Sequence, residues 1–235
     1  MGIFPVLWVF VPMLVLWLGV LIFVSFRYSN SETSIVNYLS LIIFTALCFS
    51  ILISLLELEY IKYFSILLAG LSIWFIFMQF LETKEAVLSY EQKPYRRILM
   101  ILWVFNNYIV ITFGFALSIF FPLIPFWLIS LFVGIIVGYI SMIVWQMYFA
   151  VPLRNLLLRA IVIALVVWEV MWVMHLLPLG YLSLGALVIW LWYLLQLFIR
   201  FNFGKKNIIW KKQISFLLTN LVLYFLVLYF FVRWI

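Results

Sequence analysis

The stretch LLLRAIVIALVVWEVMWVMHLLPLG, from Leu156 to Gly180, decides the fold class. It is a nearly continuous apolar run, and about 20 such residues are needed for a helix to cross a hydrocarbon core of about 30 Å. Pro178 and Gly180 then favour a turn. The stretch therefore predicts a membrane-spanning helix over residues 156–177, with one acidic residue, Glu169, close to its middle.

The composition of the whole chain agrees with this prediction. Of its 235 residues, 70% are hydrophobic and 9% are charged, whereas globular domains are about half apolar and about a quarter charged. A water-soluble core of this length cannot hold such an excess, so we expect the solvent to be the lipid bilayer. The single cysteine, Cys48, allows no internal disulfide.

Applying the same length criterion along the chain predicts an all-α fold. We expect a polytopic transmembrane helix bundle that forms one integral membrane domain over residues 1–235, with about eight spans and no soluble domain. The predicted spans are 4–26, 36–57, 60–81, 98–121, 123–148, 156–177, 180–200 and 213–233.

The basic residues predict the orientation of these spans. Twelve of the fourteen follow the odd-numbered spans, and only Lys62 and Arg233 lie on the opposite side. Because cytoplasmic loops carry the excess of Lys and Arg, we expect cytoplasmic basic loops and both termini outside. The net charge of +7 thus needs no nucleic-acid partner. We expect location in the plasma (inner) membrane of a prokaryote.

The sequence lacks the residues that several kinds of membrane enzyme and cofactor-binding protein require. Bis-histidine haem ligation needs two histidines, and His175 is the only one. All seven acidic residues are Glu, so there is no pair of aspartates for an intramembrane protease and no acidic cluster for magnesium diphosphate. We expect no metal, no cofactor and, on balance, no catalytic activity.

Glu169 is the most informative polar residue, because a charged carboxylate near the membrane centre is costly. Loss of hydration favours its neutral form. It could donate one hydrogen bond to another helix, or it could contact a cationic or polar ligand together with Trp168 and Trp172. In both cases we expect its side chain to face the bundle interior and to contact span 98–121, 123–148 or 180–200.

Uncharged amides form a second candidate group, which we place towards the cytoplasmic half of the bundle. They could bond neighbouring helices or line a vestibule. The residues are Asn106, Asn107, Gln79, Gln146 and Gln196.

Two further features concern lipid and protein partners. Arg200, Lys205, Lys206, Lys211 and Lys212 are candidates for contact with anionic lipid. Gly134 and Gly138 are four residues apart, which lets another helix approach closely. That helix could belong to the same bundle or to a second copy in a homo-oligomer.

Two functions remain open on these observations. The first is a small transporter-like binder of a polar or cationic solute or lipid, which requires a cavity that reaches Glu169 and several of the amides. The alternative is a non-catalytic membrane subunit or scaffold of a larger assembly, which binds a protein partner in the membrane. This alternative requires a flat, apolar, aromatic side on the bundle instead.

Overall fold

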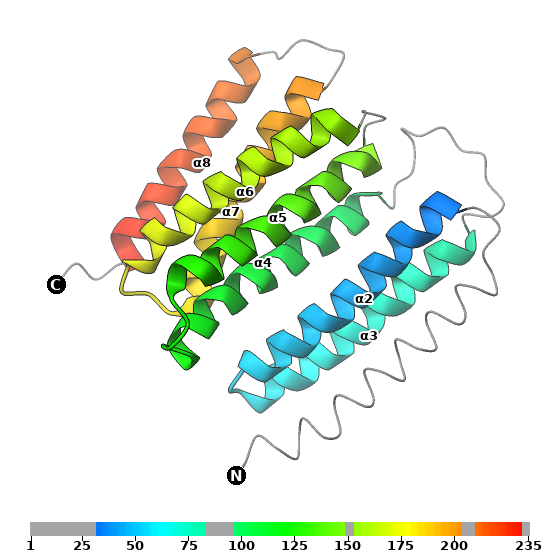
Figure 1. The fold of residues 1–235 in the computed structure, drawn as a ribbon, viewed down its shortest axis with the longest axis horizontal. Coiled ribbons are helices and arrows are strands. Elements are labelled where there is room, and N and C mark those ends of the chain that lie inside the picture. The colour runs from blue at the N-terminus through cyan, green and yellow to red at the C-terminus, as the bar shows by residue number, and fades with distance from the viewer. Residues whose placement is uncertain (1–31, 83–95, 149–152, 204–209, 232–235) are drawn as a thin grey trace. The chain divides into compact units, whose positions relative to one another are not determined.

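The computed structural model describes residues 32–82, 96–148, 153–203 and 210–231, and these residues form helices and turns without strands (Figure 1). The all-α prediction is therefore confirmed for this part of the chain. Each helix lies over one predicted span, whereas the first predicted span, 4–26, lies outside the described residues. The helices are α2 (Glu32–Leu55), α3 (Glu59–Glu82), α4 (Arg96–Phe120), α5 (Phe126–Tyr148), α6 (Leu153–His175), α7 (Tyr181–Phe203) and α8 (Trp210–Phe231).

The helices from α3 to α7 each contain a segment that is long and apolar enough to cross a membrane. Among the residues whose side chains the structure describes, α2 and α8 contribute the apolar segments Leu41–Leu55 and Ile214–Phe230. These helices are compatible with an integral membrane protein. The number of eight spans and their orientation remain predictions.

The chain divides into two compact units. The first contains α2 as far as Ile53 together with α3, and the second contains Ser54–Glu57 together with α4 to α8. That the whole chain forms one membrane domain remains a prediction.

Three pairs of consecutive helices are joined by short connections. Three residues separate α2 from α3, and five separate α4 from α5 and α6 from α7. The chain re-enters a helix directly after each turn: the Pro125 carbonyl accepts a hydrogen bond from the Leu128 amide at 3.0 Å, and the Gly180 carbonyl accepts one from Leu184 at 3.0 Å.

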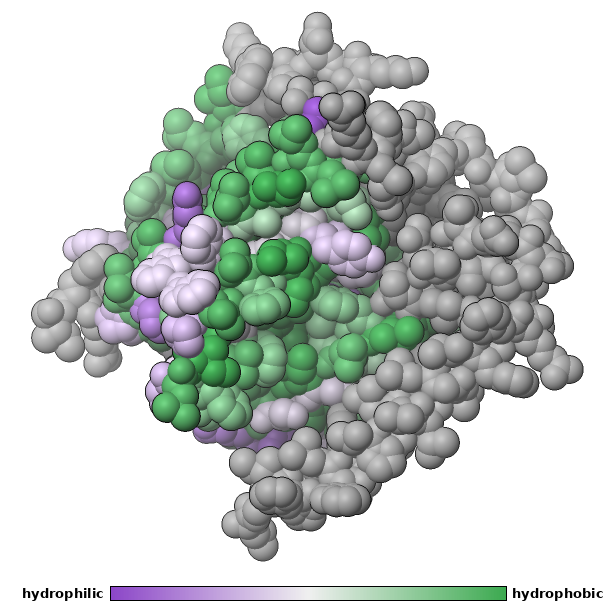
Figure 2. All heavy atoms as spheres, viewed as in Figure 1, coloured by the Kyte–Doolittle hydropathy of each residue, from purple (hydrophilic) through white to green (hydrophobic). Residues whose placement is uncertain are grey.

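Within the second unit, four helices enclose a common core. α5 packs against α4 and α6, while α7 packs against α4 and α6 and closes the arrangement. α8 lies outside it: the Trp190 indole donates to Asn220 Oδ1 at 3.2 Å, and the Tyr224 hydroxyl donates to Met174 Sδ at 3.7 Å. The molecular face in Figure 2 is largely hydrophobic wherever the surface is coloured.

Glycines allow the closest contacts between these helices. A Cβ placed at Gly134 would lie 2.7 Å from the carbonyl oxygen of Ala164, and one placed at Gly138 would lie 2.8 Å from that of Ala160. The glycine pair thus faces α6 of the same bundle. Within the bundle, the two glycines allow the close approach of α6, and a homo-oligomer through Gly134 and Gly138 remains a prediction.

We predict that Gly138→Ala lowers the free energy of unfolding by about 1–3 kcal/mol, the usual effect of overpacking. The added methyl group would have to displace the backbone of α6. Thermal unfolding in detergent measures the effect, at roughly 2–4 °C per kcal/mol for a chain of this size.

Gly70→Ala in α3 is the matched control, because nothing lies within 4 Å of a Cβ at that position. Alanine is the better helix former, so this variant should be as stable as the parent or slightly more stable. Equal unfolding temperatures for Gly138→Ala and Gly70→Ala would contradict the close contact between α5 and α6.

Candidate functional site

Two faces of α6 have opposite environments. The side chains of one face are buried against the neighbouring helices: Leu156, Ala160, Ile163, Val167, Met171 and Met174. The residues of the opposite face are exposed and recur along the sequence at intervals of four and three. We call this face the outer stripe of α6, and it consists of Leu158, Val162, Leu165, Glu169 and Trp172, together with Leu176 directly after the end of the helix.

Glu169 lies in the middle of the outer stripe, and its side chain is exposed. The expectation that it faces the bundle interior is therefore wrong. The reason is the contact with α5: Ala160 faces Gly138, and Glu169 is nine residues further on, about 180° around the helix. Among the described residues, the Glu169 carboxyl group has no hydrogen bond and no ion pair.

Glu169 lies within the apolar segment of α6, away from both of its ends. In the apolar segment Leu156–His175 it lies six residues before the end, a distance of about 9 Å. Helical side chains lean towards the helix N-terminus, so Glu169 leans away from this nearer end and towards the centre of the segment. If α6 crosses a membrane, as its length and apolarity indicate, the carboxyl group lies in hydrocarbon.

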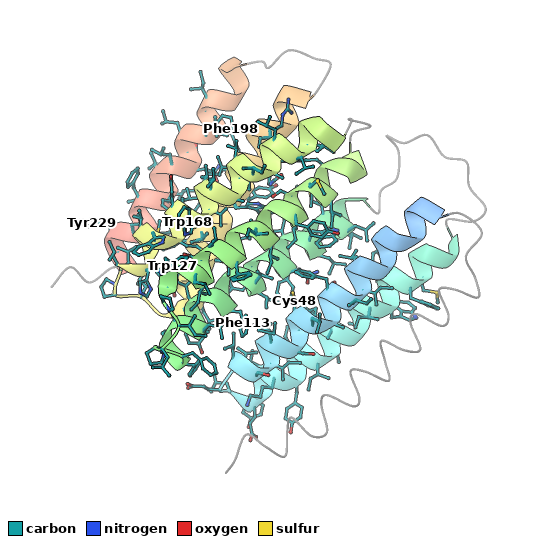
Figure 3. All side chains as sticks on the ribbon, viewed as in Figure 1. Cys48, Phe113, Trp127, Trp168, Phe198 and Tyr229 are labelled. Carbon is teal, nitrogen blue, oxygen red and sulfur yellow. The ribbon has the colours of Figure 1, made fainter. Side chains whose placement is uncertain are left out.

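The two tryptophans next to Glu169 in the sequence are separated in space. Trp172 belongs to the outer stripe with 43% of its surface exposed, and its ring meets Phe126 edge-on at 5.8 Å. Trp168, labelled in Figure 3, is half-buried on the side of α5, with its Cβ 3.5 Å from the position of a Cβ on Gly134. Only Trp172 therefore shares the exposed face with Glu169.

His175 also remains apart from Glu169. Its exposed ring stacks on Phe126 with 3.9 Å between the ring centroids. His175 ends α6 six residues after Glu169, about 9 Å further along the helix.

The amides lie elsewhere, inside the bundle. Asn106 and Asn107 have no exposed surface, and neither amide atom of Asn107 has a hydrogen-bond partner among the described residues. Gln196 is 3% exposed, and its Nε2 donates to Ser141 Oγ at 2.7 Å. For Gln196, then, the structure shows a hydrogen bond between helices.

Ser141 is the residue that sequence analysis missed. Besides Gln196, the indole of Trp192 donates to its hydroxyl oxygen at 2.9 Å, and the hydroxyl donates to the Val137 carbonyl at 2.8 Å. Its position seven residues after Gly134 puts both on one side of α5, the side with the closest contacts, and this spacing was the available signal.

The remaining candidates cannot be placed. The side chains of Gln79, Gln146, Arg200, Lys211 and Lys212 and the whole of Lys205 and Lys206 lie outside the described residues. Among the residues that are described, no three His, Cys, Asp or Glu side chains lie close enough to bind one metal ion.

Comparison with protein families, curated proteins and solved structures found no match in any of the three.

We predict that Ser141→Ala destabilises the bundle by about 1–3 kcal/mol, because it removes the acceptor of two buried donors. Ser118→Ala is the control, since the Ser118 hydroxyl bonds only the Phe115 carbonyl of its own helix, at 2.7 Å. Thermal unfolding of both variants in the same detergent gives the comparison. A Ser118 variant as unstable as the Ser141 variant would show that the bond between α5 and α7 contributes nothing specific.

Proposed function

We propose that this chain is a non-catalytic subunit or scaffold of a membrane assembly, and that it binds a transmembrane helix of another protein on the outer stripe of α6. The observation that carries this proposal is the exposed carboxyl group of Glu169 in the middle of an otherwise apolar helix face. Buried or lipid-facing carboxyl groups are costly without a partner, and a neighbouring helix supplies one.

The spacing of the outer stripe supports a helix as the partner. Exposed residues recur at intervals of 4, 3, 4, 3 and 4 from Leu158 to Leu176. An apolar repeat of this kind is the seam along which two helices pack over several turns. Within α6 the outer stripe follows that pattern from Leu158 to Trp172, for about 21 Å at 1.5 Å per residue.

A transporter-like binder has less support, because it needs Glu169 and the amides around one cavity. Asn106, Asn107 and Gln196 are buried among the helices of the bundle, and Glu169 is exposed on the far side of α6. Residues in such different surroundings do not form a common ligand site.

In the proposed arrangement the chain has eight spans in the plasma (inner) membrane of a prokaryote, with the basic loops in the cytoplasm and both termini outside. Twelve of the fourteen basic residues then lie on the cytoplasmic side. The segment with Arg200, Lys205, Lys206, Lys211 and Lys212 would contact anionic lipid there, each residue contributing about 1 kcal/mol near the surface.

A photo-crosslinking amino acid placed along α6 in native membranes tests this function. We expect one and the same partner to be captured from positions 158, 162, 165 and 172, and to be identified by mass spectrometry. Substitution at Leu218, which is 61% exposed on α8, is the control and should not capture it.

The periodicity of capture is the decisive readout. Capture at positions 157 and 161, which are exposed but lie beside the stripe, should be weaker. Crosslinks to lipid alone at every stripe position, or equal capture from Leu218, would contradict the proposed function.

A further inference from the structure

We infer that the helix bound on the outer stripe of α6 carries a basic residue, Lys or Arg, at the depth of Glu169. This inference rests on the proposed function and specifies the chemistry of the partner. Two side chains of the outer stripe, Glu169 and Trp172, support the inference of a basic partner residue.

The carboxyl group of Glu169 is the one ionisable group on the outer stripe. The other five residues of the stripe are Leu158, Val162, Leu165, Trp172 and Leu176. Ionisable residues inside membranes are typically paired with one another. A basic side chain on the bound helix would form such a pair with the Glu169 carboxyl group.

Trp172 adds a second reason to expect a cation. It is three residues after Glu169 on the same exposed face, so the two side chains are neighbours one turn apart. The face of an indole attracts ammonium and guanidinium groups. A carboxylate beside an exposed tryptophan thus favours a cation over a second amide or acid.

The described part of this chain does not supply that cation. Among the basic residues, the structure describes the side chains of Lys62 and Arg159. Lys62 belongs to the other unit, near the start of α3, and Arg159 belongs to α6 itself. Arg159 is ten residues from Glu169, or about 15 Å along the helix. Among the described side chains, none therefore supplies the charge complementary to Glu169, and we assign that charge to another polypeptide.

Designed transmembrane peptides provide the test. The full-length chain is reconstituted in phosphatidylcholine vesicles with a fluorophore at its C-terminus, and energy transfer to labelled peptides is measured. The peptides are leucine-rich 25-residue helices that differ only at the central position, which is Lys, Leu or Glu. We expect the Lys peptide to bind about tenfold more tightly than the Leu peptide, since a polar contact between membrane helices contributes about 1–2 kcal/mol.

Variants of the chain assign this preference to the carboxylate. Glu169→Gln should bind the Lys and Leu peptides with equal affinity. Glu169→Lys should transfer the preference to the Glu peptide. Glu59→Gln, at the first turn of α3, is the matched control and should keep the preference of the parent for Lys. Thermal unfolding shows that each variant is folded, and Glu169→Gln is sufficient if Glu169→Lys does not fold.

The outcomes separate this inference from the function on which it rests. Equal binding of the Lys and Leu peptides by the parent, with both peptides captured by a photo-crosslinking residue at positions 158 and 165, would overturn the basic partner and leave helix binding intact. Binding of none of the peptides would contradict both.

Two other occupants of the outer stripe are also distinguished. Energy transfer between two labelled copies of the chain that disappears in Glu169→Gln would assign the stripe to a second copy. Crosslinks from position 165 to another segment of the same chain would assign it to that segment. Either result would overturn the inference of a basic partner.

Discussion

The direct contact between the backbones of α5 and α6 fixes the rotation of α6, and the position of every polar group on that helix follows from it. Gly134 and Gly138 have no side chains, so the carbonyl groups of Ala164 and Ala160 come within the distance where a Cβ would stand. A helix held in this way cannot turn about its axis without a clash. Glu169 therefore has to lie on the opposite face, whatever the preference of its carboxyl group for a polar environment.

Polar groups inside and outside the bundle have different consequences. Ser141 accepts hydrogen bonds from Trp192 and Gln196 of α7, which links two helices that each pack mainly against α4 and α6. Such a bond is satisfied within the chain and requires nothing further. The carboxyl group of Glu169 has no partner among the described residues, so it is the group through which an external molecule would gain most from binding.

The positions of the helices could be predicted from the sequence, but which side of each helix is buried could not. Length and apolarity were sufficient to predict segments such as 98–121 and 156–177, which the structure has as α4 (Arg96–Phe120) and α6 (Leu153–His175). In a membrane helix, however, the side towards lipid is as apolar as the side towards the protein. Leu165 and Val167 are both aliphatic, yet one is 48% and the other 2% exposed. The assumption that a carboxyl group faces inward then gave the wrong face for Glu169. The small residues Gly134, Gly138, Ala160 and Ala164 mark the faces along which α5 and α6 contact each other, and these faces indicate the correct rotation of α6.

Oxygen accessibility of spin labels along α6 tests the rotation of this helix. Cys48 is first replaced by Ala, and single cysteines are then labelled at positions 163 to 172 in vesicles. We expect high accessibility to oxygen at 165, 169 and 172 and low accessibility at 163, 167 and 171. The reverse pattern, with 169 as protected as 167, would place Glu169 inside the bundle and contradict this rotation of α6.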